Sequence, residues 1–221
     1  MNDHILSATD ITKTFGTVEV VKGVSVALRA GEFVSLVGKS GSGKTTLLSL
    51  LSGLDRPTSG QVNLCGKDIV TASENELALF RRANIGFIFQ SFQLIPTLSA
   101  WENVAVPLFP EKMKEEDRRE RAVTLLKQMQ LEHRLDHLPG AMSGGEKQRV
   151  AIARALVNHP KIIFADEPTG NLDSQTGQAI MQLLETLHKE HGMTILMVTH
   201  DLELSKTADR VLRMQDGEIV A

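Results

Sequence analysis

The sequence predicts an α/β fold with a mostly parallel core sheet, a small antiparallel β subdomain and an inserted α-helical subdomain. Three observations support this prediction. Apolar runs typical of buried strands alternate with helical periods, which favours parallel strands covered by helices. Two-residue hydrophobic periods gather near the N-terminus, where they favour an antiparallel sheet. The segment from Ser99 to Ala155 has mostly helical patterns and no convincing strand.

The core sheet is expected from three apolar runs that are each followed by a helical pattern. These pairs are Phe33–Val37 with Thr45–Leu51, Ile162–Ala165 with Gln178–His188, and Thr194–Val198 with Asp201–Lys206. The segment Val211–Ile219 predicts two short strands around an Asp-Gly turn.

The smaller antiparallel sheet is expected from four segments on either side of a glycine-rich loop. They are Ile5–Thr9 and Val18–Leu28 before the loop, and Gln61–Leu64 and Ile85–Phe89 after it.

The helical insertion carries charge of both signs and clear helix starts. Ser99 and Glu102 have the spacing of a capping box, and Ser73 and Glu76 repeat that spacing earlier in the chain. The run Lys112–Arg121 alternates acids with bases, which favours the solvated face of a helix over a nucleic-acid patch.

Composition restricts the protein class. The chain has 221 residues, 42% of them hydrophobic, and a formal net charge of −3. It can bury one substantial core without disulfides, and its lone Cys65 has no partner within the chain. The charge argues against a nucleic-acid partner. We find no signal peptide and no membrane-spanning segment, so we expect a cytosolic protein whose membrane role would come through a partner.

The strongest motif is the glycine-rich loop that follows the apolar run Phe33–Val37. It matches G-x-x-x-x-G-K-[ST], in which glycines allow a close backbone and N–H groups point at a phosphate. Lys44 would reach the β- and γ-phosphates, and the Thr45 hydroxyl would ligate Mg²⁺. The predicted nucleotide-binding residues here are Gly38, Lys39, Ser40, Gly41, Ser42, Gly43, Lys44, Thr45 and Thr46.

A pair of acids ends the second apolar run of the core. Asp166 and Glu167 follow Ile162–Ala165, at the carboxyl edge where ligands collect in open α/β sheets. Asp166 would hold Mg²⁺, directly or through water, and Glu167 would polarise the attacking water as a general base. An acidic pair alone would equally fit an ordinary turn, but the neighbouring phosphate loop favours a catalytic role.

A second glycine pair stands at the predicted start of a helix, in Ser143, Gly144, Gly145 and Glu146. Spacing alone indicates a capping box with a structural role. The run Ser143–Arg149, called the signature segment below, nevertheless resembles the sequence that distinguishes ATP-binding-cassette (ABC) ATPases from other phosphate-loop proteins. This resemblance implies that Ser143, Gly144, Gly145 and Glu146 contact nucleotide.

Other positions agree with the ABC pattern in order and spacing over nearly the whole chain. Gln90 resembles the glutamine that contacts Mg²⁺ or the attacking water, and Asp173 lies in a segment resembling the D-loop. His200 resembles the switch histidine, which bonds the γ-phosphate or the attacking water, and Phe15 stands where an aromatic ring stacks on adenine. The resemblance thus implies ATP and Mg²⁺ as cofactors, with Glu167 and His200 as the catalytic residues.

Three positions depart from the commonest family pattern. Met142 and Glu146 stand where Leu and Gln are commonest, and Phe15 replaces a Tyr. Phe15 keeps the ring face needed for stacking. Glu146 is a tolerated variant.

The resemblance also implies a domain plan. Residues 1–221 would form one ABC ATP-binding domain, with 1–91 and 156–221 as the ATP-binding core and β subdomain. Residues 92–155 would form the helical subdomain with the signature segment. In this family two chains enclose two ATP molecules head to tail, so a homodimer is expected in the ATP-bound state.

Two segments, Phe89–Val104 and Phe164–Asp173, resemble the bacterial lipoprotein-releasing and macrolide-export ATPases. This likeness implies membrane-spanning permease subunits as partners and a peripheral location on the cytoplasmic face of the bacterial inner membrane. Phe92–Val104 would help to form the groove for the partner's coupling helix, or would be a surface loop that packs internally. The permease would choose the transported substrate.

Two other functions remain open at this stage. One is a soluble ABC clamp in DNA repair or translation, although such proteins generally add coiled-coil, zinc or second-cassette segments. The other is a low-turnover cassette for cell division or signalling, which the intact Asp166, Glu167 and His200 make a weaker interpretation.

Overall fold

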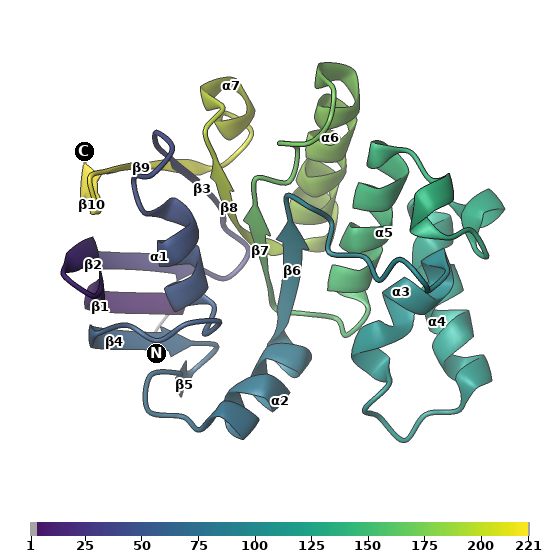
Figure 1. Cartoon of the computed structure of the whole chain (residues 1–221), viewed down its shortest axis with the longest axis horizontal. Coiled ribbons are helices and arrows are strands. Elements are labelled where there is room, and N and C mark those ends of the chain that lie inside the picture. Colours follow the sequence, from purple (N-terminus) through teal and green to yellow (C-terminus); the bar gives the residue numbers. More distant parts are fainter. Residues whose placement is uncertain (1–3, 221) are drawn as a thin grey trace.

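The computed structural model describes residues 4–220 and divides their strands between two sheets (Figure 1). Within these residues the core sheet has the order β10-β9-β3-β8-β7-β6, and the smaller sheet has the order β2-β1-β4-β5. The strands are β1 (His4–Phe15), β2 (Val18–Arg29), β3 (Phe33–Val37), β4 (Ser59–Leu64), β5 (Lys67–Asp68), β6 (Ile85–Phe89), β7 (Ile162–Asp166), β8 (Thr194–Thr199), β9 (Arg210–Gln215) and β10 (Glu218–Val220). The helices are α1 (Lys44–Leu51), α2 (Glu74–Asn84), α3 (Ala100–Ala105), α4 (Glu115–Gln128), α5 (Gly144–Leu156), α6 (Ser174–His191) and α7 (Leu202–Ser205). The predicted α/β fold class is confirmed.

The core sheet is parallel except at one edge. Strand β3 pairs in parallel with β8 and β9, and β7 pairs in parallel with β6 and β8. Only β10 runs antiparallel to its neighbour, which makes it the second strand of the predicted Asp-Gly hairpin. Because parallel strands share one direction, the carboxyl ends of β3, β6, β7 and β8 lie along the same edge.

Strand β6 corrects one prediction. We expected Ile85–Phe89 in the smaller antiparallel sheet, and this is wrong: it is an edge strand of the core, paired with β7 from Ile85 opposite Ile162 to Phe89 opposite Asp166. Ile85 packs into one core cluster and Ile88 into the other. A strand buried on both faces lacks a polar face, so its hydrophobic pattern does not reveal which sheet it joins.

The two faces of the core sheet are covered by different helices. Along β7, Ile162 and Phe164 pack with α1 and the smaller sheet, whereas Ile163 and Ala165 pack with α5 and α6. Figure 1 shows the same division, with α1 beside β1 and β2 and with α5 on the far side of β7. Full burial of each large side chain contributes about 1.5–3 kcal/mol, which holds both layers on the sheet.

The smaller sheet is antiparallel, as predicted for Ile5–Thr9, Val18–Leu28 and Gln61–Leu64. Strand β1 pairs with β2 on one side and with β4 on the other. Cys65 falls just past β4 with a left-handed φ of 50° and is partly buried.

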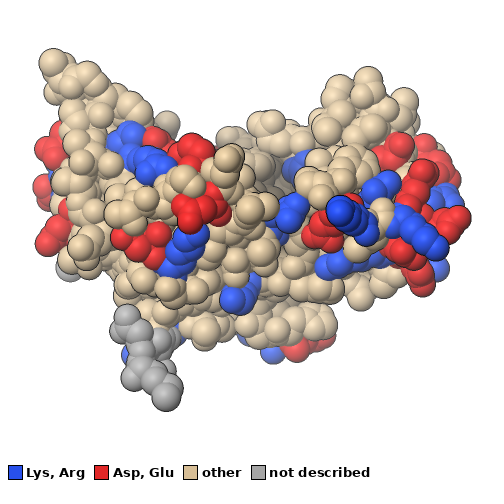
Figure 2. All heavy atoms as spheres, turned by 90° about the horizontal axis from the view of Figure 1, so that it is seen from below, with Lys and Arg blue, Asp and Glu red and all other residues tan. Residues whose placement is uncertain are grey.

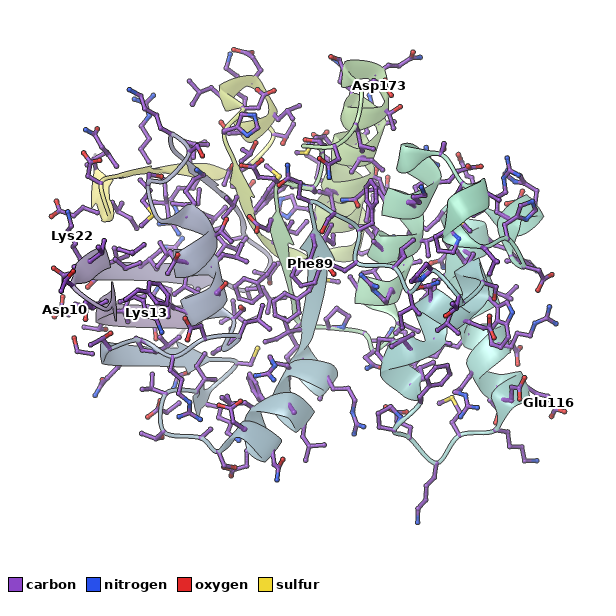
Figure 3. All side chains as sticks on the ribbon, viewed as in Figure 1. Asp10, Lys13, Lys22, Phe89, Glu116 and Asp173 are labelled. Atoms are coloured by element: carbon purple, nitrogen blue, oxygen red, sulfur yellow. The ribbon has the colours of Figure 1, made fainter. Side chains whose placement is uncertain are left out.

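The helices α3, α4 and α5 form a lobe beside β6 (Figure 1). Glu116 lies at the outer end of α4 (Figure 3), and acidic and basic side chains intermingle over the lobe's end of the molecule (Figure 2). The run Lys112–Arg121 is mostly exposed, as predicted for a solvated helix face.

The segment from Gln90 to Ser99, called the 90–99 loop below, leads from β6 into this lobe. Its second half is held by Asn103, whose buried side chain accepts a hydrogen bond from Ile95 N–H at 2.7 Å and donates to the carbonyls of Ile95 and Leu98. At the end of the loop, the Glu102 carboxylate accepts from the Ser99 N–H at 2.7 Å. The predicted helix start at Ser99 is therefore confirmed, and this half of the loop is tied to α3.

The C-terminal hairpin packs against the glycine-rich loop. The Gly217 N–H donates to the Ser42 carbonyl at 3.1 Å, and the Gly217 carbonyl accepts from the Lys22 N–H at 2.9 Å. Asp216 and Gly217 both have left-handed φ values, 51° and 90°, which suits the tight turn between β9 and β10. The hairpin therefore packs against the glycine-rich loop and supports it.

No helix within residues 4–220 is both long and apolar enough to cross a membrane.

Candidate active site

The glycine-rich loop connects β3 to α1 in a conformation that requires glycine. Gly41 and Gly43 have φ values of 79° and 99°. A Cβ added to Gly38 would lie 2.3 Å from the Met214 carbonyl oxygen, which leaves no room for a side chain. Helix α1 begins with no side-chain cap, so its first N–H groups and the positive end of its dipole are left for an anion.

The polar groups of this loop suit a polyphosphate. The Lys44 side chain is buried, and its ammonium donates to the Lys39 carbonyl at 2.9 Å across the loop. Ser42 Oγ is buried and has no hydrogen-bond partner among residues 4–220. An unpaired buried hydroxyl costs free energy that a bound acceptor would recover. The loop thus offers a cation, a hydroxyl and helix N–H groups to one anionic ligand.

Thr45 and Asp166 meet although the sequence separates them widely. The Thr45 hydroxyl donates to Asp166 Oδ1 at 3.1 Å. Burial raises the pKa of Asp166 above its usual value, and the neighbouring Glu167 charge raises it further, whereas the Thr45 bond and the Lys44 charge lower it. Hydroxyl and carboxylate oxygens beside a phosphate loop are the hard ligands that Mg²⁺ takes together with substrate phosphates.

Glu167 and His200 form a second pair at the same edge. Each follows the end of a strand, β7 or β8, and Glu167 Oε2 lies 3.1 Å from His200 Nδ1. Glu167 has a left-handed φ of 45°, unusual for a residue other than glycine. Both line a hollow of about 380 Å³ that α6 and α7 flank. A carboxylate and an imidazole in contact can hold and move a proton.

Gln90 lies next to this pair of strands. It follows Phe89, which is opposite Asp166 in the sheet and is labelled in Figure 3. The Gln90 carbonyl accepts from Asn171 Nδ2 at 2.9 Å, and a Cβ added to Gly170 would lie 2.7 Å from Gln90 Nε2. The side chain of Gln90 is thus packed against the turn that follows Glu167.

The signature segment begins α5 with the expected capping box. The Ser143 hydroxyl accepts from the Glu146 N–H at 3.3 Å, and the Glu146 carboxylate accepts from the Ser143 N–H at 2.8 Å. Arg134 of the short 3-10 helix Glu132–Arg134 donates to Glu146 Oε1 at 2.7 Å. The hydrogen bond from Ser143 and that ion pair hold the pKa of Glu146 below its usual value. The two glycines, Gly144 and Gly145, open the helix.

The lowered pKa of Glu146 makes the free energy of unfolding depend on pH. A carboxylate with a lowered folded-state pKa stabilises the protein above its ordinary pKa of 4.5, and this contribution disappears as the pH falls through the folded value. We expect Glu146→Gln to lose about 1 kcal/mol of unfolding free energy at neutral pH. Urea unfolding at several pH values should show the gap to wild type closing on acidification. A gap that is unchanged or wider in acid would contradict the ion pair.

Two predicted nucleotide contacts, Asp173 and Phe15, also make contacts within the chain. Asp173, labelled at the end of α6 in Figure 3, caps that helix: its carboxylate accepts from the Thr176 N–H at 2.9 Å and from the Thr176 hydroxyl at 2.6 Å. These bonds lower the pKa of Asp173. Phe15 leaves 52% of its surface exposed, with the Lys13 ammonium 4.9 Å from its ring centre. An exposed aromatic face is available for stacking.

Helices α1 and α5, which begin at the phosphate loop and at the signature segment, pack on opposite faces of the core sheet. The buried leucines of α1 pack in the cluster with the smaller sheet, and the buried apolar residues of α5 pack in the cluster with α3 and α4. The structure therefore joins Thr45, Asp166, Glu167 and His200 along one edge, and it leaves Ser143 in a separate surface hollow.

Sequence reasoning missed two long-range polar contacts of α5. Gln148 is fully buried and donates to the Pro168 carbonyl at 2.6 Å, next to Glu167. Arg154 donates to the carbonyls of Phe92 and Gln93 in the 90–99 loop. For Arg154 the available signal was its position as the single polar residue within the otherwise apolar run Val150–Leu156.

Comparison with known proteins decides the family. The model of the family described as "ABC transporter" matches residues 21–170, which is more than half of the chain. The chain belongs to the ABC transporter family. An uncharacterized ABC transporter ATP-binding protein of Methanocaldococcus jannaschii is 50% identical over 220 residues, 98% of each chain.

Other relatives of this ABC cassette include larger proteins and a solved structure. The macrolide export ATP-binding/permease protein MacB of Brucella melitensis is 49% identical over 216 residues, 96% of this chain but only 33% of MacB. The ATP-binding cassette MJ0796 has been solved as a dimer in a post-hydrolysis state with ADP and Pi. It superposes with a TM-score of 0.90 at 44% identity, over 98% of this chain and 97% of that one.

Proposed function

We propose that this chain is the ATP-hydrolysing subunit of a bacterial ABC transporter, converting ATP and water to ADP and phosphate. The observation that carries the proposal is the convergence, at one sheet edge, of the Thr45–Asp166 pair with the Glu167–His200 pair beside the phosphate loop. Family membership supports the same function.

Each residue of this edge has a task in the proposed reaction. Gly38–Thr46 would bind the triphosphate, with Lys44 at the β- and γ-phosphates. Thr45, Asp166 and Gln90 would hold Mg²⁺, which neutralises charge on the phosphates. Glu167 would take a proton from the attacking water, and His200, 3.1 Å away, would orient Glu167 and bond the γ-phosphate or that water. Phe15 would stack on adenine.

The opposite placement of α1 and α5 supports a homodimer as the active unit. One chain packs α1 and α5, which begin at its phosphate loop and at its signature segment, on different faces of the sheet. Two chains related head to tail would place Ser143–Glu146 of each over the ATP held by the other, with Asp173 near the junction. A γ-phosphate shared by two helix N-termini makes such a dimer depend on ATP.

We also propose a membrane partner and a location. The relation to MacB, whose name joins an ATP-binding part to a permease, supports a permease subunit of the macrolide-export or lipoprotein-release type. The chain would then sit peripherally on the cytoplasmic face of the membrane. Residues 92–155, the proposed helical subdomain, would receive the permease, while 1–91 and 156–221 would bind ATP. The permease would select the substrate.

The test is phosphate release by the full-length chain with Mg²⁺ and ATP, repeated with EDTA and with the candidate permease in membranes. We expect turnover that EDTA abolishes and that the permease stimulates. Absence of release under all these conditions would favour the low-turnover cassette. Salt-sensitive binding to DNA or ribosomes without permease association would favour the soluble clamp.

A further inference from the structure

The first half of the 90–99 loop has an unusual backbone. Phe92 and Gln93 are consecutive residues with left-handed φ values of 61° and 51°. Neither is glycine, so each costs free energy that the surroundings must offset. Gln93 is exposed and Phe92 is only partly buried, so packing contributes little at Gln93.

Hydrogen bonds within the loop hold part of this turn, from the Gln93 N–H to the Ser91 carbonyl at 2.6 Å and from Gln93 Nε2 to Ser91 Oγ at 2.9 Å, and Arg154 supplies the contacts from outside the loop. Its guanidinium donates through Nη1 to the Gln93 carbonyl at 2.5 Å and through Nη2 to the Phe92 carbonyl at 2.7 Å. Burial lowers the pKa of Arg154, and no carboxylate within residues 4–220 pairs with it as an ion pair. The two carbonyls are therefore its hydrogen-bond partners in the loop. The planar guanidinium of an arginine can donate to two adjacent carbonyls at once, in a geometry that the ammonium of a lysine does not offer.

Phe92 and Gln93 lie between the proposed reaction centre and the signature segment. Gln90, two residues before Phe92, packs against the turn that follows Glu167. On the other side, a Cβ added to Gly144 would lie 3.9 Å from Phe92 Cζ, so the Phe92 ring borders the start of α5. Arg154 stands near the far end of that same helix. The left-handed pair thus bridges Gln90 and both ends of α5.

We propose that Arg154 is a positioning residue that holds Phe92 and Gln93 in their left-handed conformation, and so sets Gln90 for hydrolysis and couples the 90–99 loop to the signature helix. This proposal rests on the ATPase function proposed above. Asn103 fixes the second half of the loop to α3, whereas the Arg154 contacts tie the first half to α5.

The test is a double-mutant cycle on the full-length chain. We expect Arg154→Met to lower kcat by about 10- to 100-fold, because a small displacement of Gln90 misaligns the reacting groups. KM for ATP should stay within about twofold, because Arg154 does not touch the phosphate loop. Gln93→Gly should have little effect alone and should restore most of the lost kcat in the double variant, because glycine adopts a left-handed φ without strain.

Arg118→Met is the matched control, since Arg118 in α4 of the same lobe also donates to a backbone carbonyl, that of Met113 at 3.0 Å. It should leave kcat unchanged. Hydrogen exchange of amides 90–95 gives a readout independent of turnover: Arg154→Met should accelerate it and Gln93→Gly should reverse part of that change.

Loss of kcat without rescue by Gln93→Gly, or unchanged exchange in amides 90–95, would overturn the proposal in favour of a merely structural arginine. A wild-type chain that hydrolyses no ATP would instead refute the ATPase function. In that case the exchange measurements still decide whether Arg154 holds the loop.

Discussion

Replacing Glu167 with Gln is expected to reduce ATP turnover by a factor of about 10² to 10⁴, the usual contribution of a general base. The amide keeps the size of the side chain and a contact with His200, but it cannot accept the proton of the attacking water. ATP binding should persist, because the phosphate loop is untouched. Phosphate release and nucleotide binding, measured on the same preparation, check both parts.

Glu203→Gln is the matched control for this variant. Glu203 lines the same hollow as Glu167 and its removal changes the charge equally, but its carboxylate pairs with Lys206 rather than with His200. We expect it to hydrolyse ATP at the wild-type rate. Equal losses in the two variants would mean that the charge of the hollow matters rather than a base at Glu167. Sedimentation with ATP should also reveal a trapped dimer of the Glu167→Gln chain, and a strictly monomeric protein with its partner present would argue against the proposed dimer.

Replacing Ser143 with Ala is expected to lower kcat by about 10² to 10³, the effect of removing one hydrogen-bond donor from a developing charge. The chain contains its own control in Ser73, which caps α2 through the same reciprocal pair with Glu76. Both variants should lose about 1 kcal/mol of stability, the usual value of a helix cap. Only Ser143→Ala should lose turnover. Equal activity in the two variants would show that Ser143 is a cap and nothing more.

Mixing two inactive chains sharpens this prediction. A Lys44→Ala chain keeps an intact signature segment, and a Ser143→Ala chain keeps an intact phosphate loop. If each site is built from two chains, their mixed dimer contains one complete site, so activity should return on mixing. Each variant alone should stay at its low rate. No recovery at concentrations where the mixed dimer forms would contradict the composite site.

The sequence predicts the parts of this site that lie within one segment. The phosphate loop and the Asp166–Glu167 pair each follow an apolar strand, and strand plus motif is a local pattern. The three capping spacings at Ser73, Ser99 and Ser143 are local in the same sense, and the bonds observed at all three confirm them.

What the sequence could not predict depends on how distant segments pair. The place of Ile85–Phe89 beside β7 is set by burial on both faces, which removes the polar alternation that would identify its sheet. The left-handed φ values at Phe92 and Gln93 arise from a guanidinium more than sixty residues along the chain.

The packing of the β9–β10 hairpin against the phosphate loop bears on how the protein folds during synthesis. The loop is synthesised early, whereas Met214 and Gly217, which back it, belong to the last strands of the described chain. Chains emerge from the ribosome N-terminus first. A nascent cassette therefore exposes Gly38–Thr45 without this support until β9 and β10 are released, so we expect the loop to reach its observed packing only after those two strands have been synthesised.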